Sequence, residues 1–141
     1  MAGIHEEPFI RKNSFMNEQI GDLVTGFRFN MIMTDTKGNF LSCLENFKIC
    51  VNNTEVCASD VFITISGRQY SIAYLPDLSD VFWNLNEDAL ITVCNGMRVE
   101  DLSQVEVSYG LRMSFLGDWE HRLVIPKYDK INFGGDKQCQ I

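Results

Sequence analysis

The segment VEVSYGLRMSF, residues 105 to 115, alternates strictly between two kinds of side chain. The odd-numbered positions are all apolar or aromatic: Val105, Val107, Tyr109, Leu111, Met113 and Phe115. The positions between them are Glu106, Ser108, Gly110, Arg112 and Ser114, none of which is a large hydrophobe. A period of two residues is typical of a β-strand with one buried face, and it excludes an amphipathic helix here. The segment therefore predicts a long strand that belongs mainly to a core.

Shorter stretches with the same alternation recur along the chain between turn residues. We expect strands over 25–33, 47–51, 62–65, 69–72, 81–85, 89–94 and 121–125, with turns at 35–39 and 66–68, a loop over 73–80 and a stop at Pro126. No stretch of ten residues has a convincing helical period. The sequence thus predicts an all-β fold, an antiparallel β-sandwich or barrel-like domain with seven or more strands and little helix.

The predicted strands divide the chain into three parts. Residues 1–21 are polar and mixed, and we expect an N-terminal arm with one short helical turn around 17–20. Residues 22–126 form the predicted β-sandwich domain. Residues 127–141 are expected to be a C-terminal tail.

The charge of the chain limits the kinds of molecule that we expect it to bind. The net charge is −7 and the twelve Lys and Arg are scattered, so neither nucleic acid nor an anionic membrane is an expected partner.

The same sequence bears on the expected location of the chain. It contains no run of eighteen apolar residues, so we expect no membrane-spanning helix, and its N-terminus has no apolar signal segment. Five cysteines, an odd number without a signal, indicate reduced thiols and a cytoplasmic location.

Residue types that carry metal or acid–base chemistry do not form a convincing pattern. Cys43, Cys50 and Cys57 recur every seven residues, but zinc ligands are usually two to four apart, so we interpret them as small hydrophobes. The run 5–7 (HEE) is interpreted as solvated, and nothing near His121 resembles an activated nucleophile. Possible carboxylate pairs can be drawn from Glu45, Glu87, Asp88, Glu106 and Glu120, but a sequence gives no distance between them. We therefore expect no catalytic residue, metal or cofactor site in this chain.

Two features inside predicted strands point to contacts with another molecule. Phe82 and Trp83 are adjacent, so one of them faces away from the core if both lie in a strand, although burial of both at a sandwich end is also open. Arg112 lies on the polar face of the 105–115 strand, where it either pairs with an acidic residue across the sheet or reaches a partner protein. Phe82, Trp83 and Arg112 are our predicted interface residues.

Several short segments follow one another in a defined order and spacing. They are Gly26-Phe27-x-Phe29, Lys37-Gly38-x-Phe40-Leu41-Ser42-x-Leu44-Glu45, Asp60-x-Phe62, Ser66-Gly67-Arg68-x-Tyr70, Trp83, Ala89-Leu90-Ile91-Thr92-Val93, and Val105-Glu106-Val107 running to Leu111-Arg112-Met113-Ser114. Over roughly residues 25 to 115, this order and spacing resemble the small (β) subunits of bacterial C-glycoside deglycosidases.

The resemblance implies a two-protein lyase. A larger TIM-barrel α subunit is expected to hold a divalent metal, usually manganese, and the acid–base residues. Its substrate is expected to be a 3-oxo-C-glucoside, such as an oxidised flavonoid C-glucoside, split at the C–C bond by elimination. This chain would then be the accessory subunit, not active alone. Two alternatives remain open: a stand-alone carbohydrate-binding β-sandwich and an independent β-sandwich hydrolase.

Overall fold

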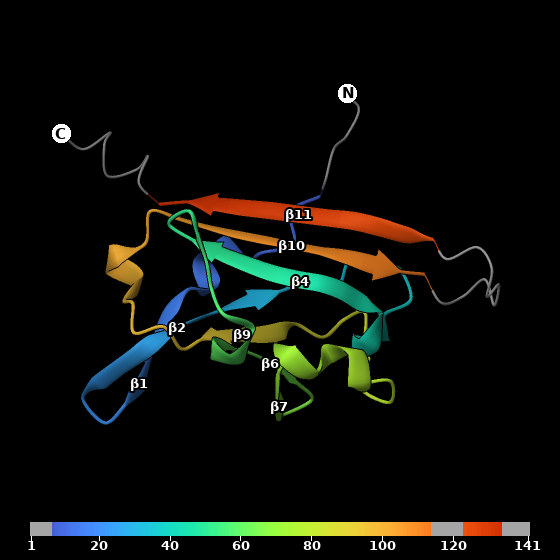
Figure 1. Ribbon diagram of the computed structural model, residues 1–141, viewed down its shortest axis with the longest axis horizontal. Coiled ribbons are helices and arrows are strands. Elements are labelled where there is room, and N and C mark those ends of the chain that lie inside the picture. The colour runs from blue at the N-terminus through green and yellow to red at the C-terminus, as the bar shows by residue number, and fades with distance from the viewer. Residues whose placement is uncertain (1–6, 114–122, 134–141) are drawn as a thin grey trace.

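Two antiparallel sheets packed face to face make up the chain (Figure 1). The computed structural model describes residues 7–113 and 123–133. The first sheet, called here the β2 sheet, has the order β1 (Met16–Ile20), β2 (Leu23–Met31), β9 (Ala89–Val93), β6 (Val61–Ile65), β7 (Arg68–Ser71). The second, the β10 sheet, has the order β11 (Val124–Asn132), β10 (Gln104–Arg112), β4 (Leu44–Val51), β5 (Thr54–Glu55). The predicted antiparallel β-sandwich is confirmed.

Short elements close the ends of the sandwich. Strands β3 (Asn39–Phe40) and β8 (Phe82–Trp83) form a small sheet of their own. The helical segments are all 3-10 turns: η1 (Lys12–Ser14), η2 (Leu41–Cys43), η3 (Ala58–Asp60), η4 (Ile72–Asp77) and η5 (Val99–Asp101). The expected loop at 73–80 thus contains η4, and the strand expected over 81–85 is reduced to the two residues of β8.

The predicted long strand is β10, and it lies between two neighbours. It pairs with β11 along its whole length and with β4 on the other side. Its four odd-numbered apolar residues, 105 to 111, are buried in the same core cluster as Phe27, Phe29 and Ile91 of the β2 sheet. Burial of one face on a central strand explains the strict alternation, because every second side chain must be apolar. Residues 114 and 115 lie outside the described residues.

The N-terminal segment differs from the expectation of an arm over 1–21. Residues 16–20, expected as a helical turn, form strand β1 paired with β2. Phe9 and Ile10 are buried, and the segment continues the sheet through two backbone hydrogen bonds, Ile32 N to Phe9 O at 2.8 Å and Arg11 N to Asn30 O at 3.0 Å. Tertiary pairing has overridden the weak local signal, since Phe9 and Ile10 are the only buried residues among the described residues 7–21.

A carboxylate on β11 hydrogen-bonds this segment to the β10 sheet. Oδ2 of Asp129, on β11, accepts hydrogen bonds from the backbone N–H groups of Phe9 and Ile10, each at 2.9 Å. Its other oxygen accepts the N–H of Lys130 at 2.8 Å. Asp129 therefore satisfies three backbone donors and links the N-terminal segment to β11.

Replacing Asp129 by Ala is expected to lower the free energy of unfolding by about 2–3 kcal/mol, because hydrogen bonds to a charged acceptor are lost and two buried residues lose their anchor. Asp129→Asn keeps one carbonyl oxygen and is expected to lose about 1 kcal/mol. Urea unfolding of the two variants measures the difference. Equal stability of Asp129→Ala and the parent chain would show that the anchor contributes nothing.

Strand β11 also corrects a predicted boundary. We expected a strand over 121–125 to stop at Pro126 and a tail to follow, but β11 runs from Val124 through Asn132. The backbone N–H groups of Met113 and Phe133 donate hydrogen bonds to the carbonyl oxygens of Leu123 and Ser103. Because the register between these two bonds is unbroken, the N–H and C=O groups of odd-numbered β11 residues face β10, and those of even-numbered residues face outward. Pro126 therefore lies at an outward-facing position on an edge strand, where the missing N–H breaks no ladder bond. His121 lies outside the described residues.

A cross-strand pair on the outer face of the β10 sheet gives a pH prediction. The Tyr128 hydroxyl donates to Oε2 of Glu106 at 2.7 Å, and this hydrogen bond, with smaller effects of burial and charge, raises the pKa of Tyr128 to about 12 from 10.0. The folded chain therefore keeps a proton that the unfolded chain releases. The contribution of this pair to stability is fully present below pH 10 and lost as pH rises toward 12.

Carbon-13 NMR of labelled tyrosine tests this shift on the folded chain. The Tyr128 signal is expected to remain that of the protonated phenol up to pH 11, and Glu106→Gln should bring its pKa down toward 10, because the charge is removed. A Tyr128 that titrates near pH 10 in the parent chain would contradict the prediction.

Candidate interaction surface

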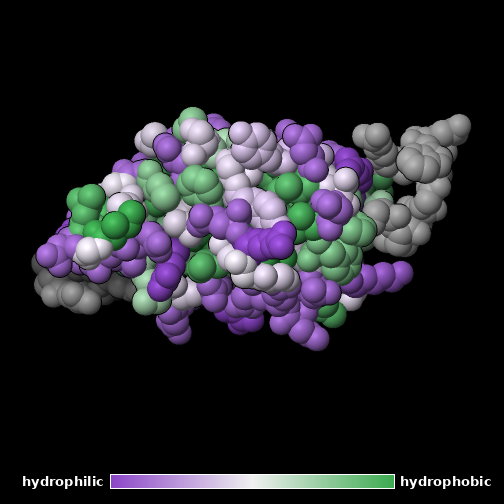
Figure 2. All heavy atoms as spheres, turned by 90° about the horizontal axis from the view of Figure 1, so that it is seen from below, coloured by the Kyte–Doolittle hydropathy of each residue, from purple (hydrophilic) through white to green (hydrophobic). Residues whose placement is uncertain are grey.

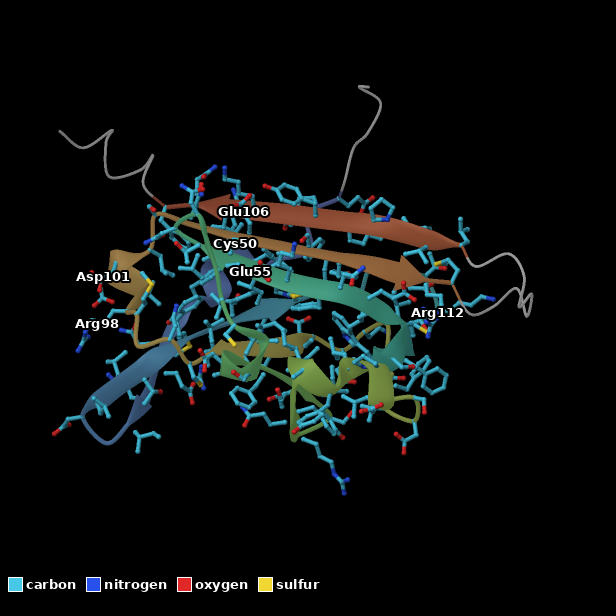
Figure 3. All side chains as sticks on the ribbon, in the orientation of Figure 1. Cys50, Glu55, Arg98, Asp101, Glu106 and Arg112 are labelled. Carbon is cyan, nitrogen blue, oxygen red and sulfur yellow. The ribbon has the colours of Figure 1, made fainter. Side chains whose placement is uncertain are left out.

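The predicted interface residues lie at one end of the sandwich, where β10 ends and β4 begins. Here Leu111 pairs with Leu44, and β3, η2, η4 and β8 close the end. We call this surface the Arg112 end and define it by Phe40, Glu45, Phe82 and Arg112. Figure 3 shows Arg112 at the opposite end of the molecule from Arg98 and Asp101.

The turn predicted at 35–39 builds the base of this surface. The buried carboxylate of Asp35 accepts hydrogen bonds from Lys37 N at 3.2 Å and from Asn39 Nδ2 at 3.1 Å. Asn39 Nδ2 also donates to the backbone carbonyl of Arg112 at 3.0 Å. One amide group thereby connects the turn, β3 and the last residue of β10, so Phe40 and Arg112 are held on the same end.

The aromatic pair is divided between the core and the surface. Trp83 is 0 % exposed, and its indole N–H donates to the carbonyl of Glu87 at 2.6 Å. Phe82 is 36 % exposed and packs edge-on against Phe40, with ring centroids 5.0 Å apart. Of the two arrangements that the sequence left open, the structure has the one in which a single ring faces outward, and Trp83, predicted as an interface residue, is instead buried. Trp83 supports the surface from inside, and Phe82 with Phe40 forms its apolar part.

Arg112 has the cross-sheet partner that the sequence allowed. Its Nη1 lies 2.7 Å from Oε2 of Glu45 on β4, and Nη2 donates to the carbonyl of Ser42 at 3.1 Å. Both charged side chains keep about 30 % of their surface exposed, 29 % and 31 %. The guanidinium is therefore fixed in orientation but still reachable from outside, so the pair does not exclude contact with a partner.

A hollow that the sequence did not predict lies beside this ion pair. It has a volume of about 490 Å³, and it lies between β4 and η4, with Glu45, Asn46, Phe47 and Arg112 on one side. Asn46 has φ 53° and lies in a bulge, where two β4 residues oppose Tyr109. Bulges redirect side chains at strand ends, and Asn tolerates this backbone region better than most residues. The Asn46-Phe47 step gave no recognisable bulge signal in the sequence.

Other ionisable groups in the described residues hold the scaffold together. Arg11 contacts Asp88 at 2.6 Å, and this hydrogen bond lowers the pKa of the Asp88 carboxyl. Glu87 binds the N–H of Ser66 in the β6–β7 turn. Within residues 7–113 and 123–133, no group of three or more His, Cys, Asp or Glu side chains gathers in a metal-binding arrangement.

The cysteines follow the expectation only in part. Cys43 is buried as a small hydrophobe, but Cys50 is half-buried and Cys57 and Cys94 are exposed. Their seven-residue spacing thus corresponds to no shared environment. Cys139 lies outside the described residues.

Gly38 is expected to be indispensable for this surface. It has φ 77°, and an added Cβ would lie 2.6 Å from the carbonyl oxygen of Trp83. Gly67 has φ 81° with nothing within 4 Å of such a Cβ, so Gly67→Ala reports backbone strain alone, about 1–2 kcal/mol. Gly38→Ala should cost about 1–3 kcal/mol more, because β8 must move. Urea unfolding and near-ultraviolet circular dichroism measure both; equal losses would show that the β3–β8 contact is not tight.

The fold places this chain in the class of antiparallel β-sandwich domains, and comparison with known families identifies the family within that class. The family model for the C-glycoside deglycosidase beta subunit matches residues 5–114, and the chain belongs to this family. The match confirms the resemblance seen in the sequence and includes β1. Membership in a beta-subunit family makes the chain one component of a heteromeric complex with an alpha subunit.

No curated protein matches the chain. Among the residues that the structure describes, no helix is long and apolar enough to cross a membrane.

Proposed function

We propose that this chain is the accessory subunit of a cytoplasmic bacterial carbon–carbon lyase and that the reacting groups lie mainly on its larger partner. The observation that carries the proposal is the match of residues 5–114 to the beta-subunit family. The scaffold roles of the described carboxylates support it, since Glu45, Glu106 and Asp129 all bind groups of this chain. The chain's task is then to bind and orient the larger subunit.

The proposed substrate is a 3-oxo-C-glucoside, for example of a flavonoid. A ketone at C3 of the sugar acidifies the hydrogen on C2, a base removes that hydrogen, and the aglycone leaves from C1 with the electron pair. A divalent metal such as manganese, proposed for a TIM-barrel partner, would supply Lewis-acid stabilisation of the ketone oxygen. No step of this reaction is assigned to a residue of the present chain.

The Arg112 end is the proposed contact with the larger subunit. Exposed Phe40 and Phe82 form an apolar centre, and Arg112 is held in place by Glu45, so it loses little side-chain freedom on binding. Aromatic residues and Arg are the residue types that most often dominate binding energy at interfaces. A stable subunit contact needs about 1,000 Å² or more, so neighbouring parts of η4 and β11 are expected to contribute.

Phe82→Asp is expected to weaken binding to the co-expressed larger subunit at least about tenfold, because a charge replaces an apolar anchor. Asn132→Asp adds the same charge at an exposed position on β11 and should bind normally. Tagged co-purification followed by calorimetry of the separated subunits measures both. Normal binding by Phe82→Asp would move the interface away from this end, and failure of the parent chain to bind the larger subunit would refute the subunit role.

The stand-alone carbohydrate-binding module has weaker support. Such modules need exposed aromatic rings along one flat face or groove. Among the described residues, the exposed aromatic side chains come from four different elements: Phe40 on β3, Tyr74 on η4, Phe82 on β8 and Tyr128 on β11. Of these, Tyr128 alone belongs to the β10 sheet. Calorimetry of the isolated chain with glucosides separates the two functions, since binding without a partner would favour the module.

A further inference from the structure

Strand β1 is an edge of the β2 sheet that has neither the short length nor the proline and lysines of the other edges, and its register with β2 shifts once, between Glu18 and Gln19. Among the described strands, β5 has two residues, β7 has four, and β11 carries Pro126 with lysines at 127 and 130. Natural proteins use short length, proline and lysine to keep edge strands from pairing with other chains. The sequence of β1, MNEQI, contains neither proline nor lysine and pairs only with β2.

The β1–β2 hairpin projects beyond the sandwich. Strand β9 pairs with β2 only from Phe27 to Met31, so the part of the hairpin before Gly26 has no strand on that side. In Figure 1 this hairpin extends from the lower left of the molecule. A two-stranded ribbon alone is only marginally stable in water, so the projecting part gains most from an added neighbour.

The projecting hairpin also carries an exposed apolar strip. Ile20 is 72 % exposed and pairs with Leu23, which is 66 % exposed. Met16 is exposed as well and shares their face, because alternate residues of a strand point to the same side. Figure 2 shows hydrophobic atoms gathered at the same end of the molecule as the hairpin. Large exposed side chains grouped in this way mark interaction surfaces.

Charge within the strip is balanced, because an acidic and a basic side chain lie together there. Glu18 Oε1 lies 3.5 Å from Arg28 Nη1, between Met16 and Ile20 on the same face. The chain as a whole has a net charge of −7, so two copies repel each other at long range. The strip offers both signs of charge together, so a copy related by a two-fold axis presents a complementary pair to it.

We infer that β1 pairs antiparallel with β1 of a second copy of this chain, so that two β2 sheets join across a two-fold axis. Antiparallel pairing of identical strands is self-complementary and closes at two copies. The hairpin and the Arg112 end lie at opposite ends of the molecule (Figures 1 and 3), so this contact leaves the proposed partner surface free. The inference concerns this chain alone and does not depend on the proposed function.

The size of the contact sets the expected strength. A strand of five residues is far smaller than the 20–30 residues a side of a standard interface. The contact is therefore weak for the isolated chain and detectable at high concentration, and it adds to other contacts in a larger assembly.

Sedimentation equilibrium over a wide concentration range tests the inference on the full chain. The parent chain is expected to approach twice its monomer mass, and Ile20→Lys with Leu23→Lys should raise the dimer dissociation constant at least about tenfold, because charge replaces apolar contact. Both positions are exposed, so the substitutions leave the core intact, which circular dichroism checks. Asn132→Lys, which adds a lysine to β11, is the control and should dimerise like the parent.

Each other result overturns the inference. A parent chain that remains monomeric at every concentration has no such contact. A dimer that is insensitive to the hairpin lysines, or that Asn132→Lys disrupts, forms through another surface. Loss of the larger subunit from the co-purified complex, with the small-subunit dimer unchanged, would assign the hairpin to that partner instead.

Discussion

The burial of one face of β10 is the constraint on which the rest of the structure depends. This strand is hydrogen-bonded to β11 and to β4, and its odd-numbered side chains fill the space between the sheets. A slip of one residue would move all of them to the solvent side, so the register of three strands is fixed together. The position of Arg112 follows from this register, since it is the last residue of β10 and lies opposite Val124.

The turns and caps at the Arg112 end convert that register into a surface. Asn39 holds the turn against the end of β10, Gly38 lets the backbone of β8 approach, and buried Trp83 fixes Phe82 outward. Each of these residues determines which side chains are presented at this end. The proposed contact with a larger subunit would require such defined positions, because interface cores are packed as closely as protein interiors.

Local periodicity explains which parts were predictable from the sequence. Strand β10 and the hairpin around Gly67 have long or sharply punctuated patterns, and both occur as expected. Strand β1 was missed because MNEQI has no alternation of its own, and its conformation depends on pairing with β2. The extension of β11 through Pro126 was missed because a proline is a stop signal in a central strand and harmless on an outer edge. The sequence indicated Phe82 and Arg112, but not the bulge at Asn46 or the hollow beside it, because both depend on contacts between distant segments.

The position of Pro126 also affects the risk of aggregation while the newly made chain is still folding. Strand β11 is nine residues long and lies at the rim of its sheet, a form that readily templates the addition of foreign strands while folding is incomplete. Pro126 has no backbone N–H, so an incoming strand that paired with the outer edge of β11 would lack one hydrogen bond at this position. The same residue that interrupted the sequence pattern thus acts as a safeguard against aggregation, at no cost to the finished sandwich.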